Sequence, residues 1–131
     1  MPSILTFTDE APNGTKLNSF TLESLAERMT TREIIRARIY QEVQDFNLNQ
    51  AGAFRGLIEP TDAERTINGS KFKKPRPIHW ETQFEEALRA FESNGFFMLV
   101  DDRQAESLDQ SFEVKVDTEI TFVKLVPLVG G

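Results

Sequence analysis

The sequence predicts an α+β domain in which a mixed β-sheet packs on a helix, with an inserted segment that carries a second helix. Three observations point to this fold class. Apolar and polar residues alternate near both ends of the chain, a helical pattern of apolar residues follows the first two predicted strands, and a second helical pattern lies inside residues 48–94. The 131 residues have the length of one domain. We therefore expect a single domain over 1–131 with an insertion at 48–94.

Two N-terminal strands form a predicted β-hairpin. Residues 3–8 and 17–25 each carry apolar side chains at alternate positions, which is typical of strands. The segment between them begins at Asp9 and contains Pro12 and the pair Asn13-Gly14, residues that favour turns. We therefore place Asp9 in the loop of this hairpin.

An amphipathic helix is expected to begin at Thr30. Thr30 and Glu33 have the spacing of a capping box, in which each side chain accepts a backbone N–H of the other residue. Apolar residues then recur every three or four positions and predict an end near Asn47 or Asn49. The stripe consists of Ile34, Ile35, Ile39, Val43 and Phe46. A stripe of this kind is typical of a helix that lies on a sheet.

The predicted insertion starts with irregular structure, because Gly and Pro interrupt residues 48–76 repeatedly. This part also holds a basic run in an otherwise acidic chain. Its members are Arg65, Lys71, Lys73, Lys74 and Arg76. The run is either a solvated loop or a docking patch for an acidic partner. A second amphipathic helix is expected over 80–93, with Asn94-Gly95 as its C-terminal stop.

The remaining strands lie after the second helix. Residues 96–100 are all apolar, which predicts a central strand covered on both faces. Residues 101–103 turn the chain, and a short strand is expected at 104–106. The adjacent Asp101 and Asp102 are compatible with Mg²⁺, but acidic pairs are more common in turns. A final strand begins at Glu119 and ends before Pro127, which has no N–H to donate.

The composition narrows the classes of function. A net charge of −6 argues against general binding of nucleic acids or anionic membranes. The chain has no Cys, and its one histidine, His79, cannot form a histidine cluster for zinc. Neither a signal peptide nor a long apolar run is apparent. We therefore expect a cytoplasmic protein that is not an enzyme and that holds no metal or cofactor.

The order of the elements resembles the β-grasp fold of ubiquitin-like proteins. The resemblance is carried by residues 20–23 with the capped helix that follows, by 99–106, and by 117–122 with Pro127 and the terminal pair Gly130-Gly131. The last stretch is similar to the sulfur-carrier proteins of molybdopterin and thiamine synthesis. The resemblance covers roughly 1–47 and 95–131, and it implies that the first and last strands are parallel neighbours. Residues 48–94 have no counterpart in the minimal fold.

The resemblance implies a bacterial protein modifier or a carrier. An E1-like adenylating enzyme would use ATP to activate the carboxylate of Gly131, and Gly130 would be its thin neighbour. The tail that would lie in the groove of this partner consists of Leu125, Val126, Pro127, Leu128 and Val129. Transfer through a thiol to an amine makes a modifier, which we favour because the insertion offers further protein contacts. An E2-like enzyme, a deconjugating protease and acceptor proteins would be further partners.

Two alternatives stay open. In a sulfur carrier the same carboxylate becomes a thiocarboxylate; in a β-grasp binding module the tail is never activated. The tail lacks the arginines that ubiquitin has before its diglycine, and Arg103 stands where ubiquitin has a linkage lysine. Leu99 stands where ubiquitin has an exposed apolar recognition residue, so it joins the candidate docking patch, although a core role is equally compatible. We expect residues 126–131 to be mobile in the isolated protein.

Overall fold

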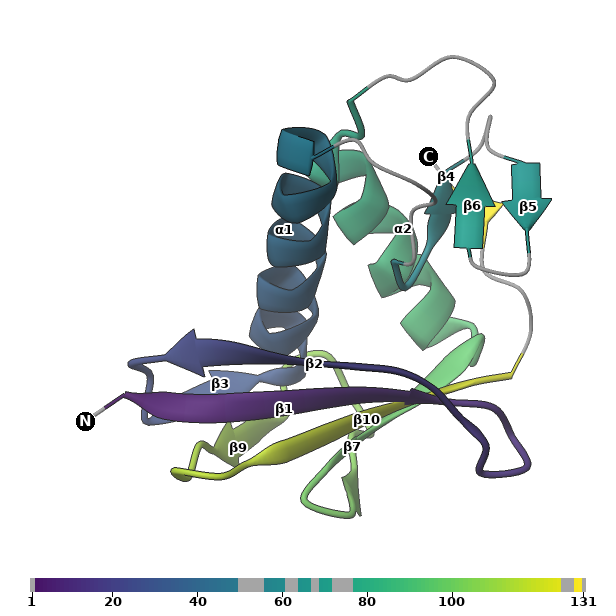
Figure 1. Cartoon of the computed structure of the whole chain (residues 1–131). Helices are drawn as coiled ribbons and strands as arrows, with labels where there is room; N and C mark the ends of the chain where they lie inside the picture. Colours follow the sequence, from purple (N-terminus) through teal and green to yellow (C-terminus); the bar gives the residue numbers. More distant parts are fainter. Residues whose placement is uncertain are drawn as a thin grey trace.

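The computed structural model describes residues 2–49, 56–60, 64–66, 69–71, 77–125 and 129–130. These residues form an α+β arrangement with a five-stranded mixed sheet and two helices on one of its faces (Figure 1). The strand order is β2-β1-β10-β7-β8. The strands are β1 (Ser3–Glu10), β2 (Lys16–Ser24), β10 (Glu119–Lys124), β7 (Phe96–Val100) and β8 (Arg103–Gln104).

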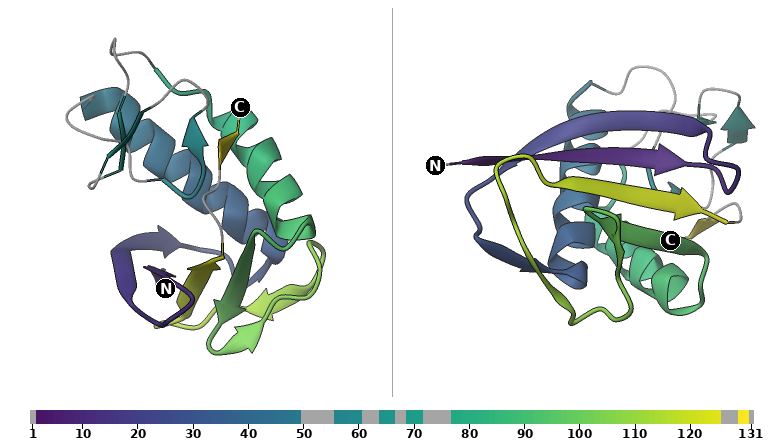
Figure 2. Two further views of the ribbon diagram at one scale, coloured as in Figure 1. Left: turned by 90° about the vertical axis from the view of Figure 1, so that its right-hand side faces the viewer. Right: turned by 90° about the horizontal axis from the view of Figure 1, so that it is seen from below.

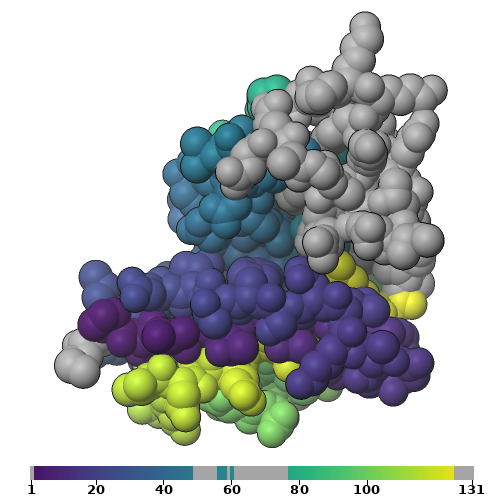
Figure 3. Space-filling model, viewed as in Figure 1, coloured from purple at the N-terminus to yellow at the C-terminus, as the bar shows by residue number. Residues whose placement is uncertain are grey.

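The first and last strands of this sheet are parallel neighbours, as predicted. β1 pairs with β10 in a register that places Phe7 opposite Ile120. All other pairs in the sheet are antiparallel, including the predicted hairpin of β1 and β2. Parallel neighbours need a crossover connection, and the chain between β1 and β10 contains both helices. Figure 3 shows the strands as one layer beneath α1.

Helix α1 (Thr31–Asn49) begins with the predicted capping box. The Thr30 N–H donates to Oε1 of Glu33 at 2.9 Å, and the Glu33 N–H donates to Oγ1 of Thr30 at 3.2 Å. The predicted apolar stripe faces the sheet, and four of its five members are buried: Ile34, Ile35, Ile39 and Val43. The predicted end of this helix is confirmed as well.

Helix α2 (Trp80–Glu92) packs against α1 and contacts β7 (Figures 1 and 2). Its C-terminal end has the two hydrogen bonds of a Schellman motif. The Gly95 N–H donates to the Ala90 carbonyl at 2.7 Å, and the Asn94 N–H donates to the Phe91 carbonyl at 3.2 Å. Asn94 has a φ of 62°, in the left-handed region that Asn tolerates. The predicted stop at Asn94-Gly95 is therefore confirmed.

Within the described ranges, three further strand pairs lie outside the main sheet. β3 (Arg28–Thr30) pairs with β9 (Ser111–Glu113) next to the start of α1. β4 (Glu59–Pro60) pairs with β11 (Val129–Gly130), and β5 (Glu64–Thr66) pairs with β6 (Gly69–Lys71). The expectation of irregular structure throughout 48–76 was therefore wrong for β4, β5 and β6. Such strands are too short to leave a periodic signal in the sequence.

The hydrophobic core lies between the sheet and the two helices. Phe7 and Phe122 come from the two parallel strands, and both are completely buried. The Phe7 ring stacks on Phe20 at 5.0 Å between centroids and on Phe122 at 6.2 Å. Leu57 and Ile58 of the insertion are also buried in this core. The insertion is thus part of the packed domain and not only an addition to its surface.

Asp9 lies inside β1, so its placement in the hairpin loop was wrong. Its carboxylate is buried and accepts two hydrogen bonds from the guanidinium of Arg38 on α1, at 2.5 and 2.7 Å. Arg38 follows Ile34 by four residues and therefore lies on the same face of the helix as the apolar stripe, where it is fully buried. Its guanidinium also lies 4.5 Å from the ring centroid of Phe122, within cation–π range.

Two other predictions are corrected in the second half of the sheet. β7 is flanked by β10 and β8 as expected, but it is not covered on both faces: Phe97 is 36% exposed, because neither helix lies on the outer face of the sheet. The short strand expected at 104–106 is found one residue earlier, as β8. In the part of the chain that the structure describes, neither helix combines the length and apolar character needed to cross a membrane.

The buried ion pair should dominate the sensitivity of this fold to substitution. We expect Asp9→Asn to lower the free energy of unfolding by about 3–5 kcal/mol, because it leaves the buried charge of Arg38 short of a counter-ion. Urea unfolding followed by circular dichroism measures this loss. The matched control is Asp109→Asn, which breaks the exposed pair of Arg32 and Asp109 and should cost less than about 1 kcal/mol. Equal losses for both variants would contradict a stabilising role of the buried pair.

Candidate functional site

The C-terminal end of β10 is the point at which the predicted reactive segment leaves the sheet. The Leu125 N–H donates to the carbonyl oxygen of Gly95 at 3.1 Å, just before β7 begins. Nζ of Lys124 lies 3.4 Å from the Gly56 carbonyl oxygen and 3.8 Å from Oδ2 of Asp9. These contacts position Lys124 and Leu125, the residues at which the chain leaves β10, next to Gly56 and Gly95.

A charge cluster lies next to this exit point; Asp9 and Arg38 form its buried centre, and Glu42 and Lys124 are its partly buried members. Arg38 binds both oxygens of Asp9, and its Nε donates to Oε2 of Glu42 at 3.2 Å. Burial alone would lower the pKa of Arg38, but the two carboxylates outweigh it and raise that pKa further above the physiological range. Arg38 is therefore a permanent cation that holds two acidic side chains in place.

Glu42 has a pKa above that of an ordinary glutamate. Burial is the largest cause, because it disfavours the charged carboxylate, and the negative charge of Asp9 adds to it. Arg38 and the N–H of Leu57 act in the opposite direction but do not compensate fully. Glu42 therefore takes up a proton at a higher pH than an ordinary glutamate does.

The insertion is held by side chains of both helices. Oε1 of Glu42 accepts the N–H of Leu57 at 2.9 Å, and Nε2 of Gln83 donates to the carbonyl oxygen of Ile58 at 2.6 Å. At the other end of the insertion, the side-chain amide of Asn47 both donates to and accepts from the backbone of Ile78, at 2.8 Å each. Buried side chains therefore set the position of the segment that leads into β4.

Three of the seven residues expected in the reactive tail, Leu125, Val129 and Gly130, fall within the described parts of the chain. Leu125 is half-buried, and Val129–Gly130 form β11, which pairs in parallel with Glu59–Pro60 of β4 and contacts α2. Figure 2 (left) shows β11 beside β4 and α2. Val126, Pro127, Leu128 and the reacting residue Gly131 lie outside the described residues. The mobility expected for 126–131 stays a prediction.

The outer face of the sheet carries two neighbouring apolar side chains. Leu99 pairs with Thr121 across the strands and is half-buried, while Phe97 pairs with Val123 and is exposed. Side chains of one strand alternate between faces, so Leu99 and Phe97 share the face opposite the helices. Leu99 is thus neither a core residue nor fully exposed, and its neighbour Phe97 offers more surface to a partner.

The basic residues of the candidate docking patch are described only in part. Arg65 lies in β5 opposite Ser70, and Lys71 lies in β6 opposite Glu64, so one short hairpin carries both. Lys73, Lys74 and Arg76 lie outside the described residues. The hairpin stands on the helix side of the sheet (Figure 1), whereas Leu99 faces the other side. These residues therefore do not share one face of the molecule.

The acidic pair after β7 forms a turn. Asp101 and Asp102 have φ values of 47° and 68°, and Oδ1 of Asp101 accepts the N–H of Glu119 at 2.9 Å. Among the described residues, no group of three or more His, Asp or Glu side chains is arranged to hold a metal ion. His79 occupies the N-cap position of α2, and its side chain makes no capping hydrogen bond.

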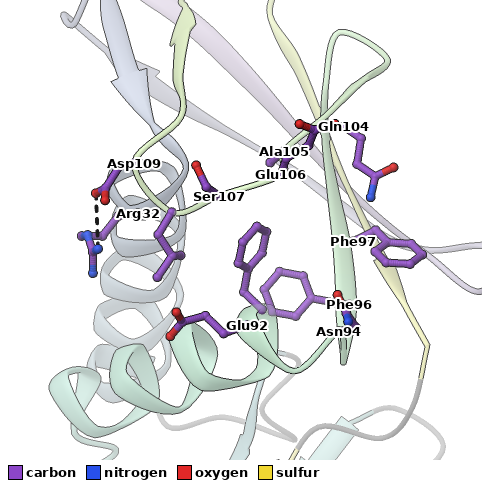
Figure 4. A pocket seen from close by; sticks show the side chains of 12 residues that line it. Arg32, Glu92, Asn94, Phe96, Phe97, Gln104, Ala105, Glu106, Ser107 and Asp109 are labelled. Carbon is purple, nitrogen blue, oxygen red and sulfur yellow. Dashed lines mark hydrogen bonds and ion pairs between the residues drawn. The ribbon is translucent and has the colours of Figure 1, made fainter.

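A pocket of about 540 Å³ opens between the start of α1, the end of α2 and the loop that follows β8 (Figure 4). Phe96 points into it, whereas Phe97 points to the opposite side of β7. Its charged lining residues are Arg32, Glu92, Glu106 and Asp109. No sequence pattern indicated this pocket, because its walls come from three separate stretches of the chain.

No protein-family model matches this chain, and neither the curated proteins nor the solved structures that were compared with it show a match. The function must therefore be inferred from the residues and their geometry. Sequence patterns missed three of the residues that shape the site, namely Arg38, Glu42 and Gln83. The available signal was a polar side chain next to an apolar stripe, but most such side chains are solvated.

The raised pKa of Glu42 predicts a pH-dependent difference in stability. A carboxyl group whose pKa is higher in the folded protein favours folding at low pH, and this contribution disappears as the pH rises through its folded pKa. Relative to Glu42→Gln, the natural chain should therefore have its largest stability advantage below the usual glutamate pKa and should lose that advantage progressively as the pH rises above it. Urea unfolding of both proteins from below to above that pKa measures the difference. A relative stability that rises with pH would contradict the assignment.

Proposed function

We propose that this protein is a ubiquitin-like modifier of the β-grasp fold, activated at the carboxylate of Gly131 by an E1-like enzyme. The observation that carries the proposal is the topology of the main sheet. A hairpin of β1 and β2, a crossover helix, and a last strand that returns parallel to β1 are what the resemblance predicts. The strand that returns, β10, leads directly into the segment with the diglycine.

The chemistry of activation needs nothing from this chain beyond its end. The carboxylate of Gly131 attacks the α-phosphate of ATP, pyrophosphate leaves, and an acyl adenylate forms on the partner enzyme. A thiolate of the partner then displaces AMP to give a thioester, and an acceptor amine displaces that thiol to give an amide. The proposal requires a mature chain that ends at Gly131. Glycines suit this role because they let the backbone approach the nucleotide closely.

The outer face of the sheet supports docking of a protein partner. Exposed aromatic and aliphatic side chains surrounded by polar ones are typical of binding surfaces. Phe97 and Leu99 are neighbours of this kind, and Thr121 and Gln104 flank Leu99 on the adjacent strands. A partner enzyme can therefore bind this face of the sheet while the C-terminal segment lies in the active site of that enzyme.

A sulfur carrier is the second candidate. The apolar tail with Pro127 is more similar to the sulfur carriers than to ubiquitin, and both functions begin with the same adenylate. They differ in the nucleophile that follows, since a sulfur donor converts the adenylate into a thiocarboxylate. In favour of conjugation, the insertion provides protein surface that a minimal carrier lacks.

Intact mass spectrometry tests the activation step. The full chain, incubated with ATP and a cognate E1-like enzyme, should gain the mass of an AMP adduct or a thioester, because its carboxylate is free to react. With a sulfur donor, a carrier instead shows replacement of one oxygen by sulfur. The control is a chain lacking Gly131, which should remain unchanged. If the full chain also stays unmodified by an active cognate enzyme, a β-grasp binding module becomes the better interpretation.

The docking role of the outer face has its own test. We expect Phe97→Ser to weaken binding of the E1-like enzyme by about tenfold or more, as the loss of a central apolar contact does, and to change stability little. Isothermal titration calorimetry with the enzyme measures the affinity. The matched control is Ile4→Ser, because Ile4 is 49% exposed on the same face at the opposite end of the sheet. Equal losses of affinity would exclude a specific role for Phe97.

A further inference from the structure

We propose that β4 of the insertion holds the C-terminal segment in the resting protein, and that this contact must open before an enzyme can take the reactive end. The inference rests on the proposed function and adds an intramolecular brake to it. Residues 48–94, which have no counterpart in the minimal fold, thereby acquire a role at the same site.

Both described ends of the segment are engaged. At its start, the N–H of Leu125 donates to the Gly95 carbonyl at 3.1 Å. At its far end, Val129 and Gly130 pair with Glu59 and Pro60 in a parallel register. β11 also lies against α2. Gly130 therefore cannot enter the narrow channel of a second protein while β11 remains paired with β4.

The strand that receives the segment is held by the core. Ile58, directly before β4, is 1% exposed, and its carbonyl accepts a hydrogen bond from the buried amide of Gln83 on α2. Leu57, equally buried, donates its N–H to Glu42 on α1. Burying these backbone groups requires such partners. β4 is thus held in place by the core. When the pairing opens, β11 is the strand that moves away from β4.

The pairing is built to be reversible. It spans two residues on each strand, and Pro60 contributes no N–H to the ladder. A ladder this short has few hydrogen bonds to lose, so it opens far more readily than the main sheet. A partner that binds the extended segment can therefore compete with β4 for it. Part of the free energy of binding the enzyme would then be used to separate β11 from β4.

An engineered disulfide tests the contact directly. Because the natural chain has no cysteine, the two introduced thiols have no other partner within the chain. The test uses the full chain with Glu59→Cys and Val129→Cys. These two positions are register partners on neighbouring strands, and the spacing between paired strands is suited to a disulfide. Under oxidised glutathione, the pair should close at least about tenfold faster than a control pair of Val129→Cys with Glu113→Cys, since proximity raises effective concentration. Glu113 is exposed in β9, away from β4.

The outcomes separate the brake from the proposed function. Closure no faster than in the control overturns the brake, whether or not the chain is activated. Rapid closure supports it, and the oxidised protein should then resist adenylation until it is reduced. Adenylation of the oxidised protein at the full rate would overturn the brake as well. If the reduced chain is never adenylated, the proposed function fails, while the engineered disulfide and the exchange measurement below still report on the contact.

Hydrogen exchange provides a second measurement that needs no enzyme. In the natural chain, the amide of Gly130 should exchange more slowly than unstructured peptide, because successive amides of a strand point to opposite sides and, with Pro60 unable to donate, the register turns the Gly130 N–H toward β4. Gln83→Leu removes the hydrogen bond to Ile58 and should speed the exchange of this amide by about two- to tenfold, the effect of one lost hydrogen bond. Asn47→Ala is the matched control, because it removes bonds to Ile78 at the other end of the insertion. An unprotected Gly130 amide in the natural chain, or equal effects of both variants, would overturn the proposal.

Discussion

The buried ion pair between Asp9 and Arg38 is the interaction on which the rest of the structure depends. It joins the end of β1 to the middle of α1 and lies against the ring of Phe122 on β10. A charge in that position is tolerated only with full compensation, so strand, helix and last strand must come together in one geometry. An apolar contact could slide by a residue, whereas a bidentate pair cannot. The pair thus specifies the register as well as adding stability.

The same cluster connects the core to the insertion. Glu42 accepts from Arg38 with one oxygen and from Leu57 with the other, while Lys124 reaches the carbonyl of Gly56. Gly56 and Leu57 thereby become extensions of the polar network beneath the sheet. Gly56 and Leu57 are therefore tied to α1 and β10. The placement of β4, which follows them, beside β11 depends on this network and on the protonation of Glu42 within it.

The predictable part of the fold consists of the elements with long periodic patterns. Alternation predicted β1, β2 and β10, a continuous apolar run predicted β7, and the capping box and apolar stripe predicted α1. Asp9 was misplaced because Asp is common in turns and rare inside strands. Its position in β1 can be understood only from its partner Arg38, which lies on a helix distant in the sequence. The exposure of Phe97 was missed for a related reason, since an apolar strand does not reveal which of its faces a helix covers.

The parallel pairing of β1 with β10 also has a consequence for biosynthesis. Thr6 lies opposite Glu119, so the central pair of the sheet joins segments from nearly opposite ends of the polypeptide. Contacts of such high sequence separation form late in folding. On the ribosome, the nascent chain can form the first hairpin and its helices early, but its sheet must wait for the last strand to emerge. Prematurely terminated products would therefore fail to fold and would be exposed to proteases.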